Sequence, residues 1–385
     1  MVHKAATFIA VNGPVTQQDR WEEDGGYSPF TMAAEIAALL IAADLAQSLG
    51  QSEPAEFLRA MADTWNSNIE RLMYAVDTEL ARQIGVEGYY VRITPPFIAD
   101  GASPLQGFVP IKNRAIGSSN QPAVEIVSPD ALALVRFGLR HPDDPRILNT
   151  IKVIDTLLRV KLPTGPNWYR YNGDGYGEHE DGSPFDGTGV GRPWPLLAGE
   201  RAHYELAAGR ADSAEALLSV MENSTGTSRL IPEQVWDQKD IPERELFTGK
   251  GSGSACPLVW AHSEYIKLRR SLADSRIFDQ PPQTVERYLV NKVSATYFNW
   301  RFNNKPRTMP CGKKLRILMM ESAMVRWSFD HWQTSHDGNS EDSGWNLQHL
   351  DLPTETLVVG RQIVFTFFWK NSGQWEGRDF VVTVE

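Results

Sequence analysis

Cysteines, long apolar runs and an excess of positive charge are all scarce in this sequence, and each scarcity excludes a class of protein. Two cysteines among 385 residues, Cys256 and Cys311, make neither a disulfide framework nor a four-cysteine zinc site. No run approaches the roughly 20 apolar residues that a membrane-spanning helix needs. The net charge of −10 disfavours the phosphate backbone of a nucleic acid and an anionic membrane. We therefore expect neither nucleic acid nor membrane among the partners.

The N-terminus also lacks a clear targeting signal. The apolar run from Ala5 to Val11 is at the short end for a secretory signal, and no A-x-A cleavage site follows it. We therefore expect these residues to belong to the fold and the chain to be cytoplasmic.

Aromatic residues, in contrast, are plentiful. The sequence has 12 tryptophans and 11 tyrosines. Aromatic planes beside carboxylates are a common way of holding sugars, although most large aromatic side chains fill cores.

Apolar residues at helical spacing dominate residues 30–274, and long Gly/Pro/Asp-rich loops separate the periodic segments. About seven helices are predicted, the clearest of them ending at Gly50. The predicted segments are 30–49, 52–72, 128–139, 145–161, 193–208, 210–222 and 256–273. Long loops in a compact domain are usually functional, so the pattern favours a toroid of paired helices with an active site in loops at one rim. No 34- or 40-residue self-similarity supports a plain helical repeat.

The texture changes after about residue 275, where β-branched and aromatic runs bounded by turn residues replace the helical pattern. The sequence predicts three parts: a helical domain at 1–274, a linker at 275–311 and a small β-sandwich-like domain at 312–385. Five tryptophans of this last part either form a sugar platform or pack its core, with at least three expected in the core. They are Trp327, Trp332, Trp345, Trp369 and Trp375.

Three loops carry the residues that could catalyse a reaction or bind a ligand. Residues 13–31 contain Trp21, Glu22 and Glu23, and adjacent carboxyls beside an apolar ring suit acid catalysis because desolvation and like charge both raise a carboxyl pKa. The alternative is a solvated acidic first turn that complements a helix dipole. Residues 168–195 offer hydrogen bonds and stacking surfaces to a polyhydroxylated ligand, and their acids do not follow the calcium-loop spacing. Residues 228–237 contain Glu233.

Four motifs in this order resemble the bacterial branch of glycoside hydrolase family 15, the glucoamylases and glucodextranases. They are WEEDGGYSPFT, YNGDGYGEHEDGSPFDGTGVGRPWPLLAGER, LIPEQVWD and PLVWAHSEYIKL. The resemblance covers residues 1–274 and implies an (α/α)6 toroid, the six-hairpin glycosidase fold. It also implies an exo-acting enzyme that releases glucose from the non-reducing ends of α-glucans with inversion, a glucan 1,4-α-glucosidase with no metal and no other cofactor.

Carried over by position, the resemblance implies two catalytic residues. Glu22 would be the general acid that protonates the glycosidic oxygen, and Glu233 the general base that activates water. Inversion requires two carboxyls about 6.5–9.5 Å apart, in environments that keep one protonated and the other ionised. The implied substrate-binding residues are Trp21, Glu23, Arg170, Tyr171 and Trp194.

The sequence departs from the family in one respect. The acid loop arrives at residue 21, without the β-domain, the first barrel helices or the Arg-Asp pair that precede it in the family. We therefore expect a toroid that is incomplete at the N-terminus, weak activity of the chain alone, and association with a complementary N-terminal portion. The alternatives are a glucodextranase or an α,α-trehalase on the same scaffold, a non-catalytic carbohydrate-binding fragment, and a helical-repeat scaffold without sugar affinity.

Overall fold

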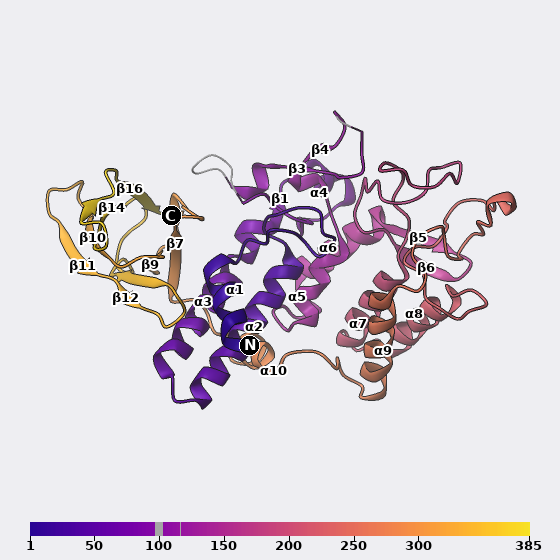
Figure 1. The fold of residues 1–385 in the computed structure, drawn as a ribbon, viewed down its shortest axis with the longest axis horizontal. Coiled ribbons are helices and arrows are strands. Elements are labelled where there is room, and N and C mark those ends of the chain that lie inside the picture. Colours follow the sequence, from indigo (N-terminus) through magenta and orange to yellow (C-terminus); the bar gives the residue numbers. More distant parts are fainter. Residues whose placement is uncertain (97–102, 116) are drawn as a thin grey trace.

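The computed structural model describes residues 1–96, 103–115 and 117–385 (Figure 1). A helical region comes first and a strand-rich region follows. The helices are α1 (Val2–Asn12), α2 (Pro29–Ser48), α3 (Ser52–Met73), α4 (Glu79–Ile84), α5 (Ala133–Arg136), α6 (Pro145–Leu157), α7 (Pro195–Ala207), α8 (Ala211–Asn223), α9 (Val259–Ala273) and α10 (Pro282–Thr284). Single turns of 3-10 or π helix add η2 (Pro104–Gln106), η3 (Ala123–Glu125), η4 (Pro129–Leu132), η5 (Pro242–Arg244) and η6 (Val285–Val290).

Helices α2 and α3 form a hairpin at the centre of the molecule, and α7, α8 and α9 form a second group at the end away from the strands (Figure 1). Pro29 starts α2 in its first turn, where a missing amide hydrogen costs nothing, and Gly50 follows it with φ +77°. The segment from Ala5 to Val11 lies within α1, which packs on α2 and buries Ala6 and Ala10.

Helix α2 also corrects one expectation about membranes. It is 20 residues long with a mean hydropathy of 1.6, enough by length and composition to cross a bilayer, and 56% of that stretch is buried within the protein. Ten of its residues, among them Ile36, Leu39 and Leu40, are buried, and α1, α3 and α5 pack on it. Contact with helices on several sides accounts for the apolar composition of α2.

The helix expected at 128–139 is shorter than predicted. The Ser128 side chain caps the 3-10 turn η4, and only α5, four residues long, follows. Gly138 stops the helix because it has φ +70°, and a side chain there would strike Val285 at 2.6 Å. Small antiparallel hairpins also occur in the connections, and the strand β5 replaces the last residues of the helix predicted at 145–161. They are β1 (Tyr74–Val76) with β2 (Gly88–Tyr90), β3 (Phe108–Pro110) with β4 (Asn120–Pro122), and β5 (Arg159–Leu162) with β6 (Gly165–Trp168).

The C-terminal region consists of two sheets with an aromatic-rich core between them. One sheet has the order β12-β13-β9-β7, and the other β11-β10-β14-β16-β8 with β15 beside β14. The strands are β7 (Tyr297–Arg301), β8 (Thr308–Met309), β9 (Lys314–Met319), β10 (Ala323–Ser328), β11 (His336–Asn339), β12 (Glu341–Asp342), β13 (Gln348–Leu352), β14 (Gln362–Trp369), β15 (Gln374–Trp375) and β16 (Phe380–Val384). Trp300, Phe365 and Phe367 lie in this core.

The boundary of the β region differs from the sequence prediction. Strands β7 and β8 lie within 275–311, the stretch predicted as a linker, and they pair in parallel with β9 and β16. The β region therefore begins near residue 297, because Phe298 and Trp300 supply part of its core. Of the five tryptophans, two rather than three lie against the β core, Trp327 and Trp369. Trp345 packs in the helical core instead, where it donates its indole hydrogen to the Pro54 carbonyl of α3 at 2.9 Å.

Candidate active site

The Asp19 carboxylate shapes the loop that precedes α2. Its Oδ1 accepts hydrogen bonds from the backbone amides of Trp21 and Glu23, both at 3.1 Å, and its Oδ2 accepts one from Arg92 at 2.6 Å. Between the two bonded amides, Glu22 adopts φ +60°, a conformation that is costly for a residue with a side chain. The turn therefore places Trp21 and Glu23 inside the protein and leaves Glu22 exposed.

The Glu23 carboxylate is the meeting point of three donors. Its Oε1 accepts from Arg170 at 2.9 Å, and its Oε2 accepts from Arg92 at 2.9 Å and from the Tyr171 hydroxyl at 2.6 Å. Burial raises the pKa of Glu23, and the neighbouring Arg170 and Arg92 oppose that rise. Since protein donors already engage both oxygens, Glu23 orients the two arginines here. Its predicted contact with substrate stays a prediction.

Arg170 is buried in an aromatic box. Two hydrogen bonds of 2.7 Å join its guanidinium to Asp174. The rings of Tyr176, Trp21 and Trp194 surround it, with centroids 4.9, 5.3 and 5.5 Å from the guanidinium carbon. Such a charge inside a ring of π faces is attracted to each of them and is held in one orientation.

The rings predicted to line sugar subsites pack on one another. The ring of Trp21 lies edge-on to that of Trp194, with 5.2 Å between the ring centroids, and its centroid is 5.4 Å from that of Trp260. Trp21 is 7% exposed, Trp194 4% and Tyr171 1%. The indole N–H groups of Trp21 and Trp194 are buried without a hydrogen-bond partner among the described residues. Unpaired donors of this kind are costly, and they mark positions where a ligand acceptor would be stabilised.

Glu233 reaches the same box from the third loop. Its backbone amide donates to the Ala255 carbonyl at 2.8 Å, and its carboxylate accepts from the Tyr176 hydroxyl at 3.3 Å. Burial raises the pKa of Glu233, while the Ala255 amide, Tyr176 and Arg170 lower it. Glu233 is therefore a partly buried carboxylate linked through one tyrosine to the Arg170 box.

Buried polar contacts hold the second and third loops together. Arg192, fully buried, pairs with Asp237 at 2.6 Å and donates to the Glu178 carbonyl at 2.6 Å. Gln234 donates to the Tyr176 carbonyl at 2.9 Å. These contacts set the position of Glu233 relative to Tyr176.

Three acidic side chains of loop 168–195 accept hydrogen bonds from residues of the same loop and do not converge on one point. Asp174 binds Arg170, Asp181 accepts from Ser183, and Asp186 accepts from Thr188. Within residues 1–96, 103–115 and 117–385, no group of three or more His, Cys, Asp or Glu side chains is arranged to hold a metal ion.

Comparisons with known proteins identify the family of the helical region. The sequence pattern of the glycosyl hydrolases family 15 matches residues 1–270, which include all three loops. The chain belongs to glycosyl hydrolase family 15. The glucoamylase of Clostridium sp. (strain G0005) is 42% identical over 291 residues, covering 75% of this chain and 38% of that protein. A crystal structure of a bacterial glucoamylase complexed with acarbose matches with a TM-score of 0.66 and 41% identity, over 75% of this chain and 40% of the other.

Family membership establishes the fold of the helical region as that of the six-hairpin glycosidases. The chain spans about 38% of the length of the Clostridium glucoamylase that it matches. The matched region ends before the β region begins near residue 297.

The structure brings most of the predicted site residues together. Trp21, Glu23, Arg170, Tyr171 and Trp194 form one contact network, and Glu233 joins it through Tyr176. Glu22 lies beside this network in sequence, with its side chain exposed and without a hydrogen bond to a described residue. The catalytic roles of Glu22 and Glu233 remain predictions that the family resemblance implies.

Sequence reasoning missed the residue at the centre of the network. Arg92 is 1% exposed and pairs with Asp19, Glu23 and Asp24 at 2.6, 2.9 and 3.1 Å. The stretch YYVRIT offered a signal, since a lone arginine in an apolar run is buried only when carboxylates compensate it. Tyr176 was also missed as the link to Glu233.

Proposed function

We propose that this chain carries the catalytic residues of a glucoamylase-like hydrolase that releases glucose from α-glucan ends with inversion. In this proposal Glu22 is the general acid and Glu233 is the general base. Arg170 and the aromatic box around it bind the terminal sugar.

One observation carries the proposal: three loops far apart in sequence converge on a single aromatic box, and a partly buried carboxylate, Glu233, is hydrogen-bonded to one of its rings. The contacts run from Glu233 to the Tyr176 hydroxyl, from the Tyr176 ring to Arg170, and from Arg170 to Glu23. Glycosidases that invert need a base, an acid on another loop and a surface for a sugar ring between them.

The electrostatic surroundings of Glu233 suit a base. Tyr176 and Arg170 favour its ionised form, although burial alone raises its pKa. An ionised carboxylate accepts a proton from water, and a hydrogen bond from Tyr176 aims one of its oxygens.

The substrate class is drawn from the relatives and from the box itself. A related bacterial glucoamylase was solved with acarbose, and the unpaired indole N–H groups of Trp21 and Trp194 offer donors to sugar oxygens. An α-glucan oligosaccharide with 1,4 linkages is the first choice. Glucodextranase or trehalase activity on the same scaffold differs only in the subsites around this box.

The exposed apolar residues support the proposal that a further portion completes the toroid. Val259 and Ile266 on α9 are 74% and 66% exposed, and Phe8 on α1 is 62% exposed. Apolar side chains on a helix face favour contact with another apolar surface. We therefore expect weak activity from the chain alone, and association with the complementary N-terminal portion of a longer relative.

The test is release of glucose from maltooligosaccharides, isomaltooligosaccharides and trehalose, with the anomer followed by NMR. The chain is assayed alone and with the complementary N-terminal portion of a relative. Glu22→Gln and Glu233→Gln should each lower kcat by at least about 100-fold, the usual contribution of a general acid or base. Glu180→Gln is the matched control, because Glu180 is an exposed glutamate of loop 168–195 with no hydrogen bond to a described residue.

Release of β-glucose that Glu22→Gln and Glu233→Gln abolish, and Glu180→Gln leaves unchanged, would support both roles. Release of α-glucose would refute inversion. Affinity for maltooligosaccharides without release, in the presence of the N-terminal portion and unchanged by Glu233→Gln, would favour a carbohydrate-binding fragment.

A further inference from the structure

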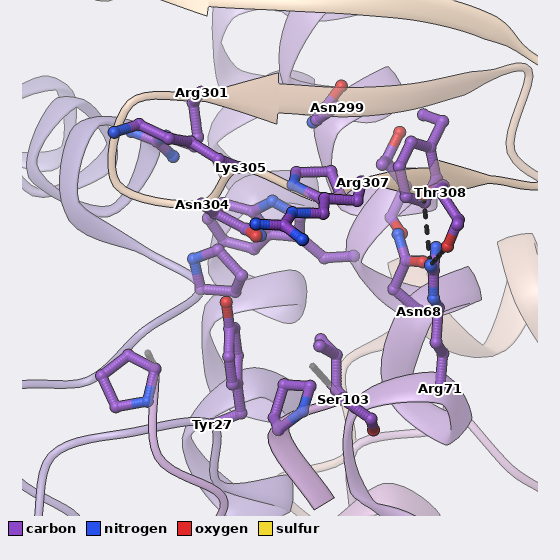
Figure 2. Close-up of a pocket in the computed structure, with 18 of the residues that line it drawn as sticks. Tyr27, Asn68, Arg71, Ser103, Asn299, Arg301, Asn304, Lys305, Arg307 and Thr308 are labelled. Atoms are coloured by element: carbon purple, nitrogen blue, oxygen red, sulfur yellow. Dashed lines mark hydrogen bonds between the residues drawn. The ribbon is translucent and has the colours of Figure 1, made fainter. Parts of the chain in front are cut away.

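A cavity of about 520 Å³ lies between the helical region and the β region, apart from the Arg170 box (Figure 2). Helix α3 contributes Thr64, Asn68 and Arg71 to one wall. The opposite wall comes from β7, β8 and the connection between them. Its size is that of a small-molecule site rather than of a packing defect.

The lining of this cavity is strongly basic although the whole chain carries a net charge of −10. Four basic side chains line it: Arg71, Arg301, Lys305 and Arg307. Among the described residues, Glu385 is the only acidic residue in the lining, and its side-chain carboxylate lies 3.2 Å from Arg71. Positive charge is therefore in excess within the cavity.

Two of these basic side chains are engaged by the protein. Arg301 donates to the carbonyls of Ala10, Val11 and Gly13, at the end of α1 and just beyond it. Arg71 donates through Nη2 to the Thr308 carbonyl at 3.2 Å. Its Nη1 is buried without a hydrogen-bond partner among the described residues. A buried donor of this kind costs free energy unless a ligand accepts its hydrogen bond.

The other two basic side chains are free to meet a ligand. Lys305 and Arg307 both line the cavity and make no side-chain hydrogen bond or ion pair with a described residue; in Figure 2 Arg307 lies beside Asn304 near the centre, and Lys305 extends toward Arg301. The spacing of separate cations around a hollow suits an anion with several oxygens.

Neutral polar groups add donors and acceptors. The Tyr27 hydroxyl points up into the cavity toward Asn304 and Arg307 (Figure 2). Burial raises the pKa of Tyr27 to about 12, so the phenol stays a hydrogen-bond donor at neutral pH. Asn299 and Asn304 add side-chain amide groups to the lining.

We propose that this cavity binds a small phosphorylated ligand, with Arg307 holding the phosphoryl group, Lys305 and Arg71 adding positive charge at the two sides of the cavity, and Tyr27 facing the rest of the ligand. A phosphoryl group presents several oxygens to separate cations, and the cavity has room for a hexose beside it. Free phosphate and a hexose phosphate share this chemistry. The binding does not depend on the hydrolase activity.

Calorimetric titration of the full chain with inorganic phosphate, glucose 6-phosphate and glucose tests the proposal. The phosphorylated compounds should bind and glucose should not. The double variant Lys305→Gln/Arg307→Gln should weaken that binding by at least about tenfold, since hydrogen bonds to charged groups are lost. Arg269→Gln is the matched control, because Arg269 is exposed on α9 and does not line the cavity.

Tighter binding of glucose 6-phosphate than of phosphate would identify the sugar phosphate as the ligand, and equal binding would identify the free anion. No binding of either compound up to about 10 mM, or binding that the double variant leaves unchanged, would overturn the proposal. Circular dichroism and thermal unfolding confirm that the variants are folded. Lys305 and Arg307 make no bonds whose loss would unfold the chain.

Discussion

The candidate active site and the cavity beside the β region both contain several arginines, and they balance that charge in opposite ways. Around Glu23, Arg92 and Arg170 meet four carboxylates at 2.6–3.1 Å, those of Asp19, Glu23, Asp24 and Asp174. In the cavity, the described lining has four basic residues, Arg71, Arg301, Lys305 and Arg307, and one acidic residue, Glu385. Paired charges hold loops in place, whereas unpaired charges attract a ligand.

This difference separates scaffold from binding surface within one molecule. Arg92 and Glu23 are buried and paired with opposite charges, so they set the positions of Trp21 and Arg170. Arg307 is exposed and has no bonding partner among the described residues, so its removal changes little but the local charge. Substitutions around Arg92 should therefore change the free energy of unfolding much more than substitutions of the basic residues in the cavity.

The largest expected effect is on the charge-paired cluster around Arg92. Arg92→Met should lower the free energy of unfolding by roughly 3–5 kcal/mol, because it leaves Asp19, Glu23 and Asp24 buried without their counter-ion. Urea unfolding at pH 7 measures this change. Arg307→Met should stay within about 0.5 kcal/mol of the parent chain. Equal losses for the two variants would contradict the distinction between the clusters.

A smaller effect is expected at Glu35, a carboxyl of α2 that is neither saturated nor ligand-facing. Burial raises its pKa from 4.5 to about 8, and its Oε2 has no partner among the described residues. Between these pKa values the unfolded chain is ionised at Glu35 while the folded chain keeps the proton. Stability contributed by this group is therefore present below pH 4.5 and lost as pH rises toward 8.

Glu35→Gln removes that pH-dependent loss. The variant should gain roughly 1–3 kcal/mol of unfolding free energy near pH 7.5 and nothing near pH 4. Glu53→Gln is the matched control, because Glu53 is an exposed glutamate on α3. A gain of the same size at both pH values would show that the effect does not come from ionisation.

The smallest expected effect concerns the link between the box and Glu233. Tyr176→Phe removes the hydroxyl that lowers the pKa of Glu233, so that pKa should move upward. Since the base must be ionised, the acidic limb of the pH profile of kcat/KM should move to higher pH. The hydrogen bond is worth about 0.5–1.5 kcal/mol, so activity at the optimum should fall modestly. An acidic limb that does not move would show that Tyr176 does not influence the pKa of the base.

Much of the fold could be read from the sequence because apolar periodicity is a local signal. The helices α2, α3 and α6–α9 lie where the pattern predicted them, and Gly50 ends the first of these. The family motifs located all three loops of the candidate site. The predicted helix at 128–139 was wrong in length, because it opens with the 3-10 turn η4 and ends at Arg136, just before Gly138 with its positive φ.

The sequence alone therefore determined the helical pattern, the change to strands in the C-terminal part and the identity of the three loops with candidate catalytic and binding residues. Tertiary structure alone decided how charges are partnered. Arg92 meets Asp19 across 73 positions and Arg71 meets Thr308 across 237. No local pattern encodes such pairs, because burial and partner geometry, which set the cost or gain of a charge, exist only once the chain has folded.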